Sequence, residues 1–467
     1  MAGSSSCGTK ISKAADFLSS LPDNVFTVIF SFLTTKEAFS TCISCKKLKH
    51  LMTVIPNVEC KETGNDCLTK KREFMESVSR FLENHDSLIK TFHLSFNPLG
   101  YRYRSDVFYW LSFVLKNGLE ELDLVFDGSN NLMFLPSLLT APNLKVLKLS
   151  HCVVNLPSII GFKSLKSLLL GSMDIPESVI GLICCHCESL QHFTLEYCSG
   201  FTKIEILDPK SKLETLILND CQTMILDNLF APFALKISSL KTLSIRQKII
   251  NFFFVGSPHI NNLILCRQAE VPVTRQESRN MKDRIIGSLG NVRTLQLAGW
   301  AFECFTAYRL NHQLSKLEKI LLLDFNVCLK NMEGLTNLIG HADGVKKLHI
   351  SINENTSGNI DSDFERVLEH FSGDDYRLPP TVAFRNSAVH IINIQGFTGT
   401  LYEMSHIKFM LAHFPRLRYL EVTPIKEMDE AQSGAYADLI SDFPMLSASV
   451  EIVMGSEEHF ICKNIEA

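Results

Sequence analysis

The dominant pattern in this 467-residue chain is a short apolar frame that recurs along most of its length. Its clearest copy runs from Leu213 to Cys221, with apolar residues at the first, fourth and sixth places and a cysteine at the ninth. Because 46% of all residues are hydrophobic, one copy carries little weight and the number of copies must decide. The frame opens at Leu119, Leu144, Leu165, Leu190, Leu213, Leu240, Ile260, Val292, Leu317 and Val345, and more loosely at Ile89, Val389 and Leu417.

This spacing is that of a leucine-rich repeat, in which the three apolar side chains point inward and an Asn or Cys supports the turn that follows. Each unit is a short strand, a turn and a return segment. It cannot bury its apolar side alone, so it is stable only when stacked on neighbours. Cys152, Cys198 and Cys221 occupy the Asn/Cys place and are expected to be buried, free thiols. The pattern predicts an α/β solenoid.

The segments before and after the solenoid have a different pattern. We expect a disordered tail at 1–16, a three-helix segment at 17–55, a linker and first helix at 56–84, the repeats at 85–380, a terminal strand–helix unit at 381–425 and an extension at 426–467. The polar stretches 267–288 and 352–381 depart from the repeat spacing and are expected to form loops or insertions on one face.

Residues 17–55 combine helix-start signals with an apolar stripe. Pro22 followed by Asp23 is typical of a helix N-terminus. Apolar residues then recur at three- and four-residue spacing, as on one face of a helix. Three short helices cannot enclose a good core alone, so we expect their exposed apolar residues to meet a partner. The expected stripe is Val25, Ile29, Phe32 and Leu33.

This segment resembles the F-box. Leu21-Pro22-Asp23, the run 29–33 and the run 35–38 stand where plant F-box proteins carry Leu-Pro-Asp, Ile-Leu-Ser-Phe-Leu and Thr-Lys-Asp/Glu-Ala. The resemblance implies docking on a Skp1-like adaptor and, through it, on a cullin-RING ubiquitin ligase. The adaptor-binding residues that it implies are Leu21, Pro22, Val25, Ile29, Phe32 and Leu33.

The end of the segment departs from the family. The runs 45–49 and 51–52 read Cys-Lys-Lys-Leu-Lys and Leu-Met, where the family usually has tryptophan-containing segments. The alternative interpretation of residues 17–55 is a helical cap that shields the open end of the solenoid, which repeat proteins require.

The later residues resemble the F-box/FBD/LRR proteins of plants. The runs 134–149, 161–168 and 187–190 are similar to their repeats, and 389–422 is similar to their FBD segment, in the order strand, Gly-Phe-x-Gly turn, helix and strand. In that family the repeats are thought to hold the protein destined for ubiquitin. The resemblance therefore implies an unknown protein substrate for this chain.

The substrate is expected on the concave strand face. Strand side chains alternate, so the places that flank each inward residue point out of the core. The outward set mixes charged and apolar residues, which suits a protein partner better than a nucleic acid. The candidate substrate-binding residues are Val146, Lys148, Leu169, His192, Glu196, Thr215, Ile217, Asn219 and Arg246.

Charge and cysteine content narrow the class further. The net charge is −4, from 46 basic and 50 acidic residues, so nothing favours nucleic-acid or anionic-membrane binding. No apolar run approaches the length of a bilayer span. The chain has 15 cysteines and no secretory signal, which predicts a reducing compartment, the nucleus or the cytoplasm.

The sequence offers little catalytic chemistry. The run 184–187, Cys-Cys-His-Cys, has metal-binding residue types, but four adjacent residues cannot converge on one tetrahedral ion. We expect it on a return helix, with no metal site and no cofactor. The pattern therefore favours a non-catalytic substrate adaptor of a Skp1-cullin-F-box ligase. The alternatives are a non-ligase protein scaffold with a degenerate F-box, and a zinc or thiol enzyme.

Overall fold

The computed structural model describes residues 22, 25, 28, 29, 32, 33, 37, 55–62, 68–97, 103–116, 118–126, 132–133, 142–153, 162–201, 204–208, 210–221, 233–246, 253–254, 259–266, 289–298, 301–302, 314–325, 327, 329–352, 387–426, 428–447 and 449–455. The predicted tail and the polar stretch 267–288 lie outside these residues, as does 352–381 apart from Ile352. The chain divides into two compact units. Unit 1 comprises residues 1–201, 211–213 and 221–224, and unit 2 comprises residues 202–210, 214–220 and 225–467.

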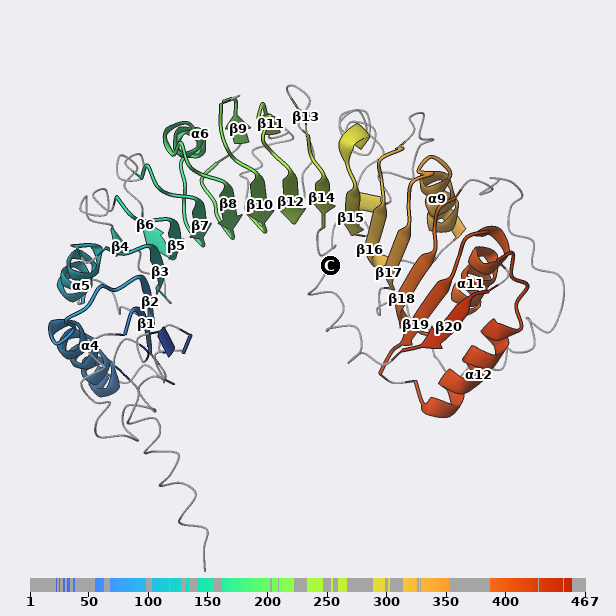
Figure 1. Ribbon diagram of the computed structural model, residues 1–467, viewed down its shortest axis with the longest axis horizontal. Coiled ribbons are helices and arrows are strands. Elements are labelled where there is room, and N and C mark those ends of the chain that lie inside the picture. Colours follow the sequence, from blue (N-terminus) through green and yellow to red (C-terminus); the bar gives the residue numbers. More distant parts are fainter. Residues whose placement is uncertain are drawn as a thin grey trace, which may run out of the picture. The chain divides into compact units, whose positions relative to one another are not determined.

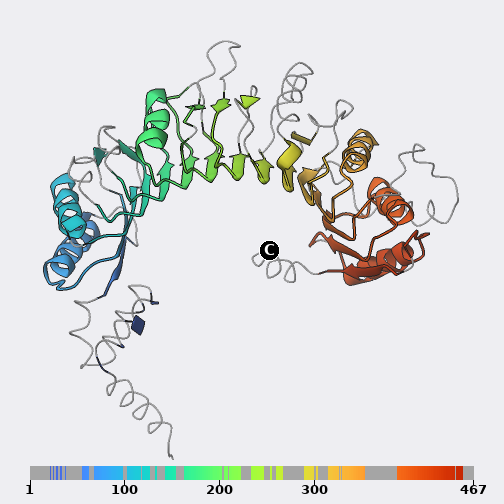
Figure 2. The ribbon, with the colours of Figure 1, turned by 45° about the horizontal axis from the view of Figure 1, so that its top comes forward.

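The strands of unit 1 pair in parallel in the order β1, β2, β3, β5, β7, β8 (Figure 1). Helices α4, α5 and α6 lie on one side of these strands (Figure 2). The main elements are β1 (Asn57–Lys61), α4 (Leu68–Glu83), β2 (Thr91–Phe96), α5 (Arg104–Lys116), β3 (Glu121–Phe126), β5 (Val146–Ser150), β7 (Ser167–Gly171), α6 (Glu177–His186) and β8 (His192–Glu196). The short strands β4 (Leu132–Met133) and β6 (Cys152–Val153) pair separately.

Unit 2 continues the same design, with strands of six or seven residues from β16 to β19. Its parallel order is β10, β12, β14, β15, β16, β17, β18, β19, β20. These are β10 (Thr215–Asn219), β12 (Thr242–Arg246), β14 (Asn262–Leu265), β15 (Thr294–Ala298), β16 (Lys319–Phe325), β17 (Lys347–Ile352), β18 (Ile391–Phe397), β19 (Tyr419–Pro424) and β20 (Glu451–Met454).

Further described elements of unit 2 stand between those strands in the chain. They are the helices α9 (Leu329–Gly340), α11 (Leu401–His413) and α12 (Glu430–Ser441), the 3₁₀ turn η4 (Leu289–Asn291), and a three-stranded sheet of β9 (Ile204–Ile206), β11 (Phe233–Leu235) and β13 (Phe253–Phe254).

The predicted repeat register is confirmed. Each frame opener is buried, and a strand begins two residues after it in every frame, as at Leu119 for β3 and Leu190 for β8. Along the strands, inward residues are buried and their neighbours are half-buried, as in the alternation of β3 and β10. The α/β solenoid predicted from the sequence is therefore present in both units.

The stretch 56–84, expected to be a linker and first helix, contains strand β1 before helix α4. The residues of β1 pair with β2 in the register Asn57↔Thr91 to Lys61↔Ser95. Ile55, two residues before the strand, is fully buried, so this is a further frame that the sequence analysis missed. The extension at 426–467 likewise contains α12 and β20, which pairs with β19.

The basic run at 70–72 belongs to helix α4 and is not entirely exposed. Lys71 lies on α4 and is fully buried. Its ammonium lies 3.5 Å from Glu62 Oε1 and donates a hydrogen bond to the Asn97 carbonyl oxygen. The Asn97 backbone N–H in turn donates to Glu62 Oε2 at 3.1 Å. A buried ammonium needs such a partner, and the network ties α4 to the ends of β1 and β2.

Candidate protein-interaction surfaces

The N-terminal segment exposes apolar side chains. Among its described residues, Val25, Val28 and Ile29 are helical, and the Val25 N–H donates to the Pro22 carbonyl oxygen at 3.0 Å. Phe32 is 83% exposed and Val28 59% exposed. Pro22 is exposed and Leu33 half-buried, while Leu21 lies outside the described residues.

Exposed apolar groups of this kind favour a protein partner. Val28 is an exposed apolar residue that the sequence analysis left out, because the predicted stripe ran through Val25, Ile29, Phe32 and Leu33. Its 59% exposure places it among the apolar groups that a partner could cover.

The face of each sheet away from the helices, here called the open face, carries the predicted substrate-binding residues. All nine are half-buried or exposed, so alternation placed each of them out of the core. In unit 1 these are Val146, Lys148, Leu169, His192 and Glu196. In unit 2 they are Thr215, Ile217, Asn219 and Arg246.

Lys148 already has acidic neighbours on the adjacent strand. Its ammonium lies 2.9 Å from Glu121 Oε1 and 3.9 Å from Asp123 Oδ2. Asp123 also contacts His93 Nδ1 at 3.1 Å, and its hydrogen bond raises the pKa of that imidazole. The hydrogen bond that the Lys148 ammonium donates to the Glu121 carboxylate raises the pKa of Lys148. The open face of β2, β3 and β5 is therefore a paired charge network.

The acidic and imidazole members of this network were missed by the sequence analysis. The candidate set began at the frame of Leu144, although the same alternation rule applies at Ile89 and Leu119. Applying it there would have found His93, Glu121 and Asp123.

The turn after each of several strands has one recurring geometry. His151, Tyr197 and Asp220 have φ values of 58°, 51° and 47°, and each directly precedes one of the three predicted turn cysteines. The N–H of Asp220 donates to the Arg246 carbonyl oxygen at 3.1 Å, so the left-handed residue links one strand end to the next.

The three turn cysteines are buried and free, as predicted. The Cys198 thiol donates to the Leu170 carbonyl oxygen at 3.2 Å, and the Cys221 thiol donates to the Leu195 carbonyl oxygen at 3.5 Å. Burial raises the pKa of Cys152 well above its usual range, whereas a hydrogen bond with Cys221 lowers the pKa of Cys198. The thiols satisfy strand-end carbonyls, which is a structural role.

The cysteine cluster at 184–187 lies on α6 and its C-terminal cap, as expected for a return helix. Cys184 and Cys187 are buried, and Cys185 and His186 are exposed, so the four side chains diverge. Burial raises the pKa of Cys187 to about 11. Within the described residues no group of three or more His, Cys, Asp or Glu could hold a metal ion, and no helix is long and apolar enough to cross a membrane.

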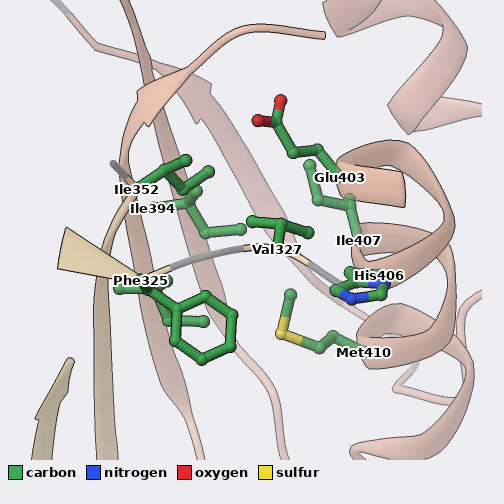
Figure 3. Close-up of a pocket in the computed structure, with 9 residues that line it drawn as sticks. Phe325, Val327, Ile352, Ile394, Glu403, His406, Ile407 and Met410 are labelled. Carbon is green, nitrogen blue, oxygen red and sulfur yellow. The ribbon is translucent and has the colours of Figure 1, made fainter. Parts of the chain in front are cut away.

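Unit 2 contains a small apolar cavity behind β17 and β18. Figure 3 shows Ile352 and Ile394 on one side and His406, Ile407 and Met410 of α11 on the other. Its volume is about 20 Å³, enough for one water molecule. Both ring nitrogens of His406 are buried without a hydrogen-bond partner, and burial lowers its pKa to about 3. The cavity is too small for a cofactor or substrate.

Two protein families match the chain. Residues 18–57 match the F-box domain, and residues 81–298 match the LRR domain of At1g61320/AtMIF1. The chain carries an F-box domain and a leucine-rich-repeat domain. The F-box match covers the exposed apolar residues described above, and the repeat match covers all nine open-face candidates.

Curated relatives share this organisation. The chain is 23% identical over 462 residues to the F-box/FBD/LRR-repeat protein At1g13570 of Arabidopsis thaliana, covering 94% of this chain and 99% of the relative. It is 25% identical over 482 residues to the putative F-box/LRR-repeat protein At5g38386 of the same plant, with the same coverage. A third, the putative F-box/LRR-repeat protein At3g42770, is 32% identical over 183 residues, 35% of this chain and 34% of the relative. The resemblance to the F-box/FBD/LRR proteins is confirmed.

Proposed function

We propose that this protein is the substrate-recognition adaptor of a Skp1-cullin-F-box ubiquitin ligase. The F-box docks the Skp1-like subunit, and the repeats hold a target protein. The observation that carries the proposal is the coincidence of the F-box match at 18–57 with exposed apolar side chains at Val25, Val28 and Phe32. An apolar surface of this kind is typical of a permanent partner interface.

In this role the chain is not itself an enzyme. It holds the target close to a ubiquitin-charged E2 enzyme, so the rate gain comes from proximity and the reactive thioester belongs to other chains. The proposal includes a nuclear or cytoplasmic location, which the free thiols among the described cysteines support.

The test is adaptor binding by a double variant, Leu21→Ala with Pro22→Ala. It removes the helix-start proline and the apolar residue before it, so a recombinant Skp1-like protein should no longer co-precipitate with the full chain. A matched control is Leu446→Ala, which removes an exposed apolar side chain in unit 2. The control should bind the adaptor like the unmodified protein, and circular dichroism should show folded repeats in both variants.

Adaptor binding that survives in the double variant would contradict the proposed docking surface. One sequence feature favours the second candidate, a non-ligase scaffold with a degenerate F-box. That feature is the run 45–52, which lacks the family's tryptophans and lies outside the described residues. If the unmodified chain captures a target protein but neither a Skp1-like subunit nor a cullin, the scaffold function replaces the adaptor function.

A further inference from the structure

Unit 2 has a pocket at the edge of the sheet where its last parallel strands begin. The pocket has a volume of about 480 Å³. It lies at the N-terminal ends of β17, β18 and β19, beside the segment that leads into β20. Its polar lining comes from Lys346, His390, Arg416, Arg418, Ser447 and Ser449. None of these residues belongs to the F-box or to the predicted substrate-binding set.

The repeat register brings three of these residues side by side. Lys346, His390 and Arg418 each stand directly before a strand, at β17, β18 and β19. The His390 N–H donates to the Lys346 carbonyl oxygen at 3.0 Å, and the Arg418 N–H donates to the His390 carbonyl oxygen at 2.9 Å. Adjacent strands lie about 4.8 Å apart, so three nitrogen-bearing side chains follow one another along the edge.

The charge of the pocket is positive. Lys346 has one carboxylate neighbour, Glu318 Oε2 at 3.5 Å. Arg416 and Arg418 are exposed, and no carboxylate of the described residues lies within ion-pair distance of either guanidinium. Lys145 with Glu120 at 2.7 Å and Lys241 with Glu214 at 2.8 Å form the same kind of pair at this position in earlier repeats, whereas the residues that follow Lys346 at this position are His390 and Arg418.

Further donors complete the lining. His390 Nδ1–H donates to the Ala388 carbonyl oxygen at 3.2 Å, so Nε2 donates to a ligand oxygen only when the ring is an imidazolium. Ser447 and Ser449 add hydroxyl groups from a segment fixed at both ends, by Leu446 N–H to the Leu411 carbonyl oxygen at 3.0 Å and by Glu451 N–H to the Arg418 carbonyl oxygen at 2.8 Å. Backbone hydrogen bonds thus fix the main chain that carries these side chains before any ligand arrives.

Two lysines on the open face add to the local positive charge. Lys347, at the start of β17, follows Lys346 in the chain, and its cross-strand partner is Lys319, at the start of β16. Burial, and then the charge of Lys347, lowers the pKa of Lys319. Clustered cations raise the local concentration of anions.

We propose that this pocket binds a phosphate monoester group. Arginine presents a planar fork of N–H donors that matches phosphate oxygens, and lysine adds a point charge. Hydroxyl donors at Ser447 and Ser449 would hydrogen-bond the same oxygens. The pocket is larger than a single phosphate group, so part of the molecule that carries the phosphate also fits inside.

The ligand is a local anion rather than a nucleic-acid chain. The whole protein has a net charge of −4, and the cations are concentrated at one edge instead of forming a long basic track. The phosphate group could come from a phosphorylated protein side chain or from a small phosphorylated molecule. The inference does not depend on adaptor binding by the F-box.

The experiment is a titration of the full-length chain by calorimetry with three probes. These are phenyl phosphate, a degenerate peptide pool centred on phosphoserine with its unphosphorylated counterpart, and glucose 6-phosphate. We expect phenyl phosphate to bind, with an affinity that falls as salt rises. Replacing both arginines, in Arg416→Ala with Arg418→Ala, should weaken it at least about tenfold, because two charge-assisted hydrogen-bond donors are lost.

The matched control is Arg293→Ala. Arg293 is exposed, stands directly before β15 at the same repeat position, and is not part of the pocket lining. This variant should bind the probes like the unmodified chain. Circular dichroism and a thermal melt of each variant separate loss of binding from loss of folding.

Each outcome bears on the proposal. Selective binding of the phosphopeptide pool identifies a protein source, and selective binding of glucose 6-phosphate identifies a small-molecule source; both support a phosphate site. The site is refuted if no probe binds, if the double arginine variant binds as well as the unmodified chain, or if Arg293→Ala loses as much affinity. An adaptor that still co-precipitates with the double arginine variant shows that the two functions are separate.

Discussion

Single residues with left-handed backbone set the turns of this solenoid. Tyr197 has a φ of 51° and lies between the end of β8 and the buried Cys198, and His151 and Asp220 occupy the same place in their repeats. Residues other than glycine adopt this region at a cost of roughly 1–2 kcal/mol, and His and Asp are among those that tolerate it best. The Tyr197 side chain is 63% exposed, so its packing contributes little to the stability of the turn.

A pair of substitutions at Tyr197 tests this geometry. Tyr197→Val should lower the free energy of unfolding by about 1–2 kcal/mol, because a β-branched side chain clashes with the backbone at positive φ. Tyr197→Gly should change it by less than about 0.5 kcal/mol, because glycine adopts the conformation without strain and little packing is lost. Urea unfolding followed by circular dichroism measures both. Equal stability of the two variants would contradict the left-handed turn.

At the scale of elements, the junction of β18 and α11 is the most tightly determined part of unit 2. Thr400 caps α11, and the buried carboxylate of Glu403 accepts hydrogen bonds from the N–H groups of Thr398 at 2.9 Å and Gly399 at 2.8 Å. Burial raises the pKa of Glu403 against the effect of these hydrogen bonds. The Tyr436 hydroxyl of α12 donates to the Gly399 carbonyl oxygen at 3.0 Å, so one turn holds a strand and two helices together.

Gly399 is required at this junction. Its φ is 78°, and a Cβ there would lie 2.3 Å from the buried Tyr436 ring and hydroxyl. Gly399→Ala should therefore lower the free energy of unfolding by roughly 2–4 kcal/mol, through overpacking and backbone strain together. The control is Gly434→Ala on α12, where no atom lies within 4 Å of the added Cβ and helix propensity should raise stability by about 0.5–1 kcal/mol. If both variants melted at the same urea concentration, the contact with Tyr436 would be wrong.

At the scale of the whole molecule, the proposed adaptor needs two surfaces that work independently. Replacing a charged residue of the open face can disturb the sheet, substrate binding or both, depending on the residue. Lys148 sits between Glu121 and Asp123, so reversing its charge would leave several carboxylates together and disturb the sheet as well as any substrate. Glu196 and Arg246 are better probes of partner choice. Glu196 is half-buried at the end of β8, and Arg246 is exposed at the end of β12.

Reversing these two charges should separate substrate capture from adaptor binding. With Glu196→Lys and Arg246→Glu together, capture of a substrate identified by proximity labelling under proteasome inhibition should fall at least about tenfold, because charges at the edge of an interface set partner choice. Co-precipitation of the Skp1-like subunit should not change. The control reverses Lys166 and Glu188, two exposed charges in the segments just before β7 and β8. Undiminished capture by the first variant would move the substrate site off the open face.

Local periodicity determined the repeats of this protein. The openers from Ile89 to Leu417, the strands two residues after them and the buried Cys198 all follow from near-neighbour chain geometry, because side chains alternate along a strand. The same rule placed Lys148 and Arg246 outside the core. It was not applied to β1, although Ile55, Val58 and Cys60 fill the first, fourth and sixth places of the same frame.

Tertiary structure decided which of these residues meet. The pairing of Lys71 with Glu62, and the position of Ser447 and Ser449 beside Arg416 and Arg418, join residues from separate segments of the chain. Their meeting depends on the irregular lengths of the return segments and on the register between strands. Those distances have no local signature, because loop length changes the free energy of the chain only slowly and leaves little mark on the sequence pattern.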